Sequence, residues 1–184
     1  RSTLDGTLFP YTTLFRSHLL SLREPEGFWS GRLSSSALAT ATAVSALVLG
    51  GEAADAPLVR AGVAWLRATQ NTDGGWGDTP GSPSNLPTTL LVLSAFRMAG
   101  EPDSAADRRY AVARAGTTPA EWRAAILRIY GADRTFAVPI LMHCALARLM
   151  PWEGIPDLPF ELAVVPRAWY SALQLRVVSY EIGR

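Results

Sequence analysis

The sequence carries little charge of either sign and almost no cysteine. Charged residues make up 18% of its 184 positions, the formal net charge is +1, and Cys144 is the single cysteine. A near-neutral balance argues against a nucleic-acid-binding protein, because phosphate recognition needs a strongly basic surface. One cysteine cannot form an intramolecular disulfide, so the chain is not a disulfide scaffold. Lysine is absent, and all 17 basic residues are arginine.

Long hydrophobic runs are also missing. The uncharged segment Leu33–Gly51 comes closest to a membrane span, but its serine and threonine residues dilute it too far. His143 and Cys144 are neighbours and point about 100° apart on a helix, so they do not converge on a metal. We expect a buried structural pair there. The sequence predicts no metal site and no cofactor.

The two ends contain strings that match laboratory DNA. Residues Thr7–Ser17 read TLFPYTTLFRS, which is the in-frame translation of a common sequencing adapter. The last four residues, Glu181–Arg184, fit the opposite adapter. We therefore expect residues 1–17 to be adapter-derived and disordered, residues 181–184 to be adapter-derived, and residues 18–180 to be a fragment of a longer protein. The alternative is a natural hydrophobic N-terminus.

The distribution of charge predicts an all-α architecture with two kinds of helix. Charged segments with helical spacing of apolar residues, such as 56–70 and 104–130, alternate with three uncharged segments. These uncharged segments, which are apolar all round as buried helices are, comprise Leu33–Gly51, Leu86–Phe96 and Thr135–Ala147. Outer amphipathic helices that alternate with buried inner ones predict an α/α barrel, or toroid, of which this chain is a part.

An internal repeat supports this architecture. The segment Arg23–Trp29 matches Gln70–Trp76, which lies 47 residues further along, so that Gly27 and Trp29 correspond to Gly74 and Trp76. Each repeat is expected to contain an outer helix, a Gly-Trp turn and an inner helix. A third unit, Ala105–Leu149, lacks the Gly-Trp turn.

The second turn has a physical interpretation of its own. Gln70 lies near the predicted end of a helix, where carbonyl groups lack partners, and its amide can donate to one of them. Gly74 or Gly75 permits the left-handed turn that ends the helix, and Trp76 can cover the amide. We expect a structural clasp between helices and no chemical role. The segment resembles the QW motif of triterpene cyclases, carried here by Arg60, Trp65, Gln70, Gly74, Gly75 and Trp76.

The C-terminal half strengthens this resemblance. Asp133–Leu141, Trp152–Leu162 and Val178–Tyr180 are similar to the N-terminal half of squalene–hopene cyclases and their bacterial squalene-cyclase-like relatives. The first repeat departs from the family because Arg23 replaces the usual glutamine, so we expect a degenerate clasp there. The segment Gly81–Thr88 is neutral, whereas hopene cyclases often have an acidic, glycine-rich stretch. A paralogue therefore stays as open as a strict hopene synthase.

The resemblance implies an enzyme that cyclises a linear C30 isoprenoid such as squalene by a proton-initiated carbocation cascade. The family signature for the acid is Asp-x-Asp-Asp, which this sequence lacks. The fragment alone is therefore expected to be inactive and to contribute scaffold and cavity wall. The resemblance makes Tyr180 the first candidate for an aromatic that faces substrate, followed by Trp169. It also implies a monotopic parent at the cytoplasmic face of the inner membrane.

A second hypothesis belongs to another functional class. Every strong motif in this sequence is structural, and one fold serves many functions. The chain could therefore be a non-catalytic α/α-toroid domain for binding or scaffolding.

Overall fold

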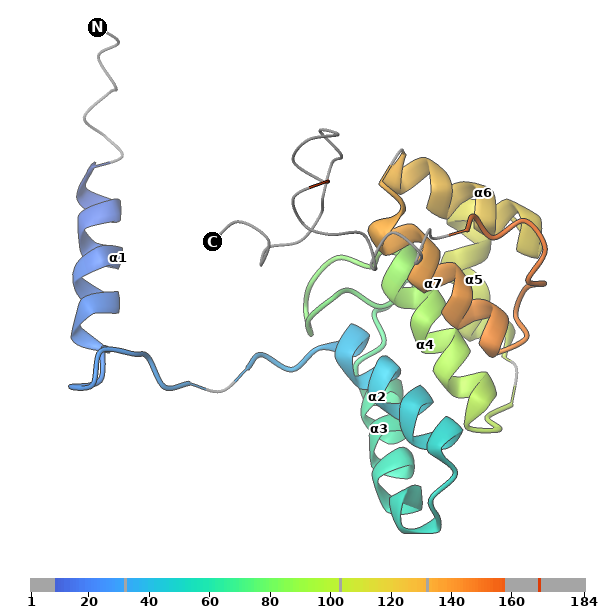
Figure 1. Ribbon diagram of the computed structural model, residues 1–184, viewed down its shortest axis with the longest axis horizontal. Coiled ribbons are helices and arrows are strands. Elements are labelled where there is room, and N and C mark those ends of the chain that lie inside the picture. The colour runs from blue at the N-terminus through green and yellow to red at the C-terminus, as the bar shows by residue number, and fades with distance from the viewer. Residues whose placement is uncertain (1–8, 32, 103, 132, 158–168, 170–184) are drawn as a thin grey trace, which may run out of the picture. The chain divides into compact units, whose positions relative to one another are not determined.

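The computed structural model describes residues 9–31, 33–102, 104–131, 133–157 and 169 (Figure 1). All regular structure in these residues is helical, as the sequence predicts. The chain divides into two compact units, residues 1–34 and residues 35–184. None of the helices in the described ranges has the length and apolar character needed to cross a bilayer.

The first unit contains helix α1, Phe9–Ser21, followed by a turn that ends at Trp29. The helix includes residues 9–17 of the segment that the sequence assigns to adapter-derived DNA. Its bounds lie 47 residues before those of α3, which is the interval of the sequence repeat.

The second unit contains the remaining helices. In chain order they are α2 (Ala37–Gly50), the short 3₁₀ helix η1 (Ala53–Asp55), α3 (Ala56–Ala68), α4 (Leu86–Met98), α5 (Ala105–Ala115), α6 (Pro119–Tyr130) and α7 (Arg134–Leu146). Side-chain caps explain where several of them begin. Ser36, Asn85 and Ser104 each accept a hydrogen bond from a backbone N–H in the first turn of α2, α4 and α5. Thr118 and Glu121 form a reciprocal capping box at the start of α6.

The helices of the second unit form two layers (Figure 1). The three helices that contain the uncharged segments lie side by side, with α4 between α2 and α7. The charged helices pack on this layer: α3 on α2, α5 on α4 and α6 on α7. This is the inner and outer arrangement that the charge distribution predicts. The third repeat differs from the expected pair, because two charged helices, α5 and α6, precede its inner helix.

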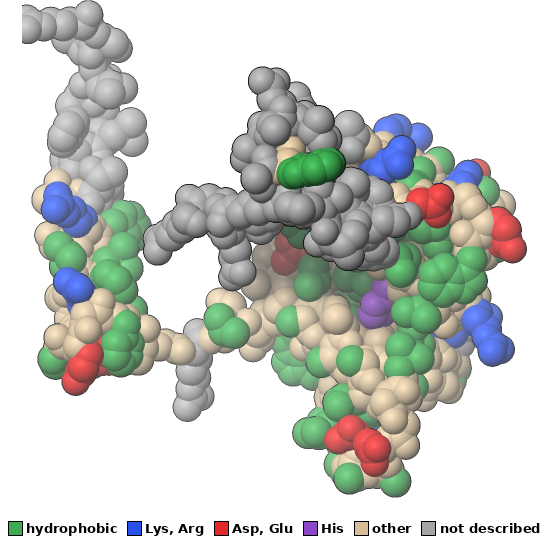
Figure 2. Space-filling model, viewed as in Figure 1, with side chains coloured by type: hydrophobic (Ala, Val, Ile, Leu, Met, Phe, Trp, Pro, Cys, Tyr) green, Lys and Arg blue, Asp and Glu red, His purple; other side chains and the backbone are tan. Residues whose placement is uncertain are grey.

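Burial of the inner layer corrects one expectation. Helix α4 is buried nearly all round, whereas α2 leaves Leu38 and Leu49 exposed, and α7 leaves Phe136 and Leu146 exposed. Within the described residues, α4 has an inner neighbour on each side, but α2 and α7 lie at the edges of the layer. Figure 2 shows the resulting surface, on which hydrophobic and uncharged polar groups predominate and charged side chains gather near the edges.

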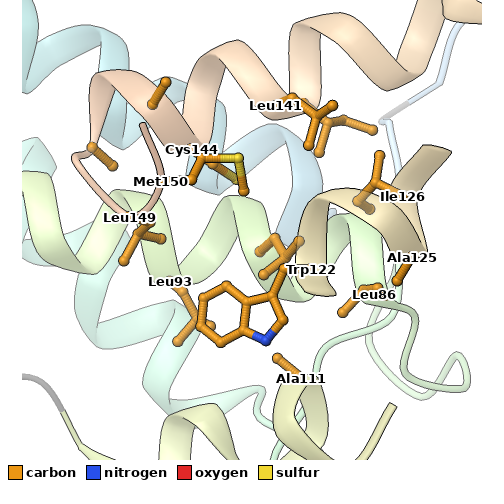
Figure 3. Packing of buried hydrophobic residues seen from close by; sticks show 14 of the residues in the cluster. Leu86, Leu93, Ala111, Trp122, Ala125, Ile126, Leu141, Cys144, Leu149 and Met150 are labelled. Carbon is orange, nitrogen blue, oxygen red and sulfur yellow. The ribbon is translucent and has the colours of Figure 1, made fainter. Parts of the chain in front are cut away.

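Two hydrophobic clusters hold the layers together. One cluster joins α2, α3 and α4 around Leu66, Trp76 and Phe96. The other joins α4, α5, α6 and α7 around Trp122. In Figure 3 this side chain projects from α6, and Leu93 of α4 lies beside it.

Candidate functional site

The Gly-Trp turn between α3 and α4 is held by the indole of Trp76. This side chain is 1% exposed, and its Nε1–H donates to the carbonyl oxygen of Leu66 at 2.8 Å. Leu66 lies in the last turn of α3, where carbonyl groups lack partners within the helix. The indole ring meets the ring of Phe96 on α4 edge to face, with centroids 5.7 Å apart. One residue thus joins the end of α3 to α4, and the predicted clasp is present.

Gln70 contributes differently from the prediction. Its Nε2 donates to the carbonyl oxygen of Gly74 at 3.1 Å and to Oδ1 of Asp107 at 3.4 Å. The expected bond to a carbonyl at the helix end does not form, because Trp76 and the hydroxyl of Thr69 already donate to those carbonyls. Gln70 therefore closes its own turn and connects it to α5.

Glycine is required at two positions of this turn for different structural reasons. Gly74 has φ +86°, so it is the residue that supplies the left-handed conformation. A Cβ at Gly75 would stand 2.6 Å from Cγ of Tyr110, so this position allows α5 to approach the turn closely.

Asp73 and Ser84 fasten the turn to the loop before α4. Oδ1 of Asp73 accepts hydrogen bonds from the backbone N–H of Gly75 at 3.0 Å and from Oγ of Ser84 at 2.7 Å. Desolvation opposes the charge of Asp73, but these hydrogen bonds outweigh it and lower the pKa of the carboxyl group.

The first repeat keeps the same hydrogen bonds 47 residues earlier. The indole Nε1–H of Trp29 donates to the carbonyl oxygen of Leu19 at 2.6 Å, and Gly27 has φ +96°. Nε of Arg23 donates to the carbonyl oxygen of Gly27 at 2.9 Å, which is the bond that Gln70 makes to Gly74. The guanidinium N–H thus replaces the amide donor, but Trp29 is 51% exposed whereas Trp76 is 1% exposed, so the hydrogen bonds are kept and the burial of the indole is not.

A charged cluster that the sequence patterns do not predict lies beside the second turn. Arg67 on α3 pairs with Asp107 on α5 and with Glu101, and its guanidinium lies 4.1 Å from the ring centroid of Phe96. Burial opposes the charge of Arg67, but its two acidic partners outweigh this effect and raise its pKa. Asp107 is 4% exposed, so its carboxylate depends on Arg67 and Gln70 for partners. Only tertiary packing brings these residues together.

The other predicted motif residues lie outside the hydrogen bonds of the clasp. Trp65 is half-buried against the cluster around Trp76. Arg60 is exposed on α3. The third repeat, which lacks the Gly-Trp turn, has a related bond, since Nε1 of the buried Trp122 donates to the carbonyl oxygen of Gly116 at 2.7 Å.

Of the expected buried pair His143 and Cys144, Cys144 is buried and His143 is half-buried. Nε2 of His143 lies 2.8 Å from Oγ of Ser45, which joins α7 to α2. Burial lowers the pKa of His143 and raises the pKa of the Cys144 thiol to about 11. The thiol is fully buried and therefore does not act as a nucleophile at neutral pH.

The candidate substrate-facing residues are placed as follows. Trp169 is 61% exposed, and Tyr180 lies outside the described residues. Within the described ranges there is no group of three or more His, Cys, Asp or Glu residues that could hold a metal ion.

Comparison with known proteins identifies the family. The family model described as the squalene-hopene cyclase N-terminal domain matches residues 13–180. A terpene cyclase-glycosyl transferase fusion protein of Humicola fuscoatra is 32% identical over 170 residues, which cover 86% of this chain and 11% of that protein. A squalene–hopene cyclase of Bradyrhizobium diazoefficiens is 33% identical over 105 residues, which cover 50% of this chain and 16% of that protein.

A third relative is a squalene hopane cyclase of Aspergillus fumigatus, which is 29% identical over 103 residues that cover 55% of this chain and 12% of that protein. The chain thus spans only 11 to 16% of the length of these three relatives. No solved structure gives a significant match. The family match extends over most of the chain and includes both Gly-Trp turns, so the chain belongs to the squalene-hopene cyclase N-terminal domain family.

Proposed function

We propose that this chain is part of a triterpene cyclase that converts a linear C30 isoprenoid into a polycyclic product by a proton-initiated carbocation cascade. The observation that carries the proposal is the family match over residues 13–180. The names of the relatives support it, since one is a squalene–hopene cyclase and another a squalene hopane cyclase.

The proposed role of this segment is scaffold and cavity wall. Its strongest built features are structural: the turn at Trp76 joins α3 to α4, and the turn at Trp29 closes the end of α1. The sequence lacks Asp-x-Asp-Asp, so the rest of the parent would supply the acid, and the fragment alone would be inactive. Tyr180 and Trp169 are our candidates for aromatic rings that face the substrate, because the face of such a ring stabilises a nearby cation. The chemistry needs no cofactor.

The expected location of the parent follows from its substrate. A C30 hydrocarbon leaves water for the interior of a bilayer. We therefore propose a monotopic parent at the cytoplasmic face of the inner membrane, with the family resemblance as support.

We also propose that residues 1–17 and 181–184 come from sequencing adapters and that residues 18–180 belong to the natural protein. The eleven-residue string Thr7–Ser17 supports this, as does the end of the family match at Tyr180. The match begins at residue 13, so residues 13–17 fall within both the adapter-like string and the matched range.

The decisive experiment reads the source DNA before His18 and after Tyr180. We expect one open frame that continues into further Gly-Trp repeats and an Asp-x-Asp-Asp. The full-length product is then incubated with squalene, and extracts are analysed by gas chromatography and mass spectrometry for cyclised C30 products. An Asp→Asn change in that acid should abolish turnover.

A full-length frame without the acid, and without cyclised product, would overturn the cyclase proposal. The non-catalytic α/α-toroid domain would then be the better account. A frame that continues through Thr7–Ser17 in clean genomic sequence would overturn the adapter proposal alone.

A further inference from the structure

A groove of about 370 Å³ lies where the loop before α4 meets α5 and α6. Two arginines from different helices line it, Arg114 of α5 and Arg128 of α6. Asn85, Pro87, Tyr110 and Ile129 also line it. The groove therefore combines basic groups with apolar side chains.

One wall of the groove is held by contacts of Tyr110. Tyr110 is buried, and its hydroxyl donates to the carbonyl oxygen of Ser84. The guanidinium of Arg114 lies 5.5 Å from the ring centroid of Tyr110, which guides the direction of this arginine. Arg128 is exposed on the neighbouring helix.

The charge of these two arginines is not neutralised within the described chain, where the salt bridges all involve Arg67. Other arginines of α5 and α6 are engaged elsewhere: Arg109 donates to the carbonyl oxygen of Asp73, and Arg123 to that of Gly154. The acid linked to the groove is Asp78, whose Oδ1 accepts hydrogen bonds from Asn85 and Thr88. One carboxylate does not balance two guanidinium groups, so the groove keeps a net positive charge.

The chemistry of the groove selects its occupant. Guanidinium groups bind phosphate oxygens in a planar, forked geometry. Ile129 is 55% exposed at the groove, so a ligand with an apolar part beside its phosphate would cover it. An anionic phospholipid has both parts, whereas an acidic peptide leaves the apolar side chain unused.

We propose that this groove binds the phosphate headgroup of an anionic phospholipid and so orients the parent protein on a bilayer. The inference rests on the proposed function in one respect, since a lipophilic substrate brings the enzyme to a membrane.

The test measures binding of the 184-residue chain to vesicles by co-sedimentation. Vesicles of phosphatidylcholine and phosphatidylserine in equal parts are compared with vesicles of phosphatidylcholine alone. The double variant Arg114→Gln/Arg128→Gln should bind the anionic vesicles roughly 10- to 30-fold more weakly, because each basic residue near such a surface strengthens binding roughly fivefold. Circular dichroism verifies that each variant keeps its helices.

The matched control removes the same charge elsewhere. Arg134 and Arg148 are exposed and outside the groove, so Arg134→Gln/Arg148→Gln should bind as the unchanged chain does. An equal loss in both double variants would show a general charge effect and overturn the proposal. Groove variants that bind anionic vesicles as the unchanged chain does would also overturn the proposal. The same holds if inorganic phosphate or an acidic peptide binds the groove of a chain that does not bind vesicles.

Failure here is separable from failure of the proposed function. Squalene turnover by the full-length parent in detergent needs no bilayer. The groove variant should therefore retain turnover in detergent, and loss of vesicle binding with retained turnover supports the proposal. A parent that turns over squalene but shows no groove-dependent vesicle binding would overturn this inference and leave the cyclase standing.

Discussion

Trp76 combines two interactions that a smaller ring can separate. Trp76→Phe keeps an aromatic ring near Phe96 but removes the Nε1–H that donates to Leu66. We expect a loss of about 1 to 2 kcal/mol in the free energy of unfolding, from one hydrogen bond and some lost volume. Trp76→Ala should cost about 3 to 5 kcal/mol because it also opens a cavity. Urea unfolding followed by circular dichroism measures both.

The control for this substitution is Trp152→Phe. Trp152 is 50% exposed, so the change should stay within about 0.5 kcal/mol. Equal costs for Trp76→Phe and Trp152→Phe would contradict the role that we assign to the indole N–H.

His143 makes stability depend on pH. Burial lowers its folded pKa, whereas the unfolded side chain titrates near 6.5. The unfolded chain therefore binds more protons as the pH falls below about 6.5, so stability is full above that pH and decreases below it. The loss becomes constant below the folded pKa. Unfolding midpoints of the unchanged chain and His143→Gln, measured between about pH 5 and 8, should show a smaller decrease in the variant.

A second variant separates titration from the hydrogen bond. Ser45→Ala removes the partner of His143 but keeps the half-buried imidazole, so it should lower stability and retain the pH dependence. If His143→Gln kept the full dependence on pH, another group would have to be responsible.

Single residues show which parts of the site the sequence predicts. The positions of Gly74 and Trp76 follow from local rules, because a helix end needs a left-handed residue and donors for its last carbonyls. The donors to those carbonyls are Trp76 and Thr69 and not Gln70, because only the packed structure decides which side chain near the turn reaches them. The pairing of Arg67 with Asp107 joins residues 40 positions apart, which no local pattern encodes.

At the scale of elements, the Gly-Trp turn is limited by backbone conformation and by its neighbour α5. In Gly74→Ala the new Cβ would combine a φ of +86° with a 2.9 Å approach to the carbonyl oxygen of Ala106. We expect this substitution to cost about 2 to 3 kcal/mol, since the left-handed conformation alone costs roughly 1 to 2 kcal/mol. Thermal or urea unfolding measures the effect.

Gly81 provides the matched position for this experiment. Its φ is +80°, and an added Cβ would meet nothing within 4 Å. Gly81→Ala should therefore show the conformational cost alone, about 1 to 2 kcal/mol. If the two variants were equally stable, contact between the turn and α5 would not matter.

The connection between α3 and α5 depends on Arg67. Arg67→Met leaves the buried carboxylate of Asp107 without its cationic partner, so we expect a loss of up to about 3 kcal/mol. Asp107→Leu removes the carboxylate itself. A double-mutant cycle should therefore give the pair Arg67→Met/Asp107→Leu a smaller loss than the sum of the two single losses. Additive losses in urea unfolding would show that the two residues act independently.

At the scale of the whole molecule, the two layers follow from the distribution of charge. Segments without charge became the inner helices α2, α4 and α7, because they are the helices that can lose water on most sides. Burial on all sides was predicted for three helices and is found for α4. Helices α2 and α7 lie at the edges of the layer, so each keeps one free face within the described chain. The third repeat was expected to have one outer helix but has two, because Gly116 and Pro119 interrupt the charged segment 104–130 and divide it into α5 and α6.

The two hydrophobic clusters predict that the second unit is stable by itself. Their buried residues all lie between Ala37 and Met150, within residues 35–184. Removal of residues 1–34 therefore takes no member from either cluster, and the free energy of unfolding should change by no more than about 0.5 kcal/mol. Urea unfolding of residues 35–184 beside the full chain tests this, with circular dichroism as the signal. A lower midpoint for the shorter chain would mean that the first repeat supports the second, and the 47-residue units would then be mutually dependent, as stacked repeats are.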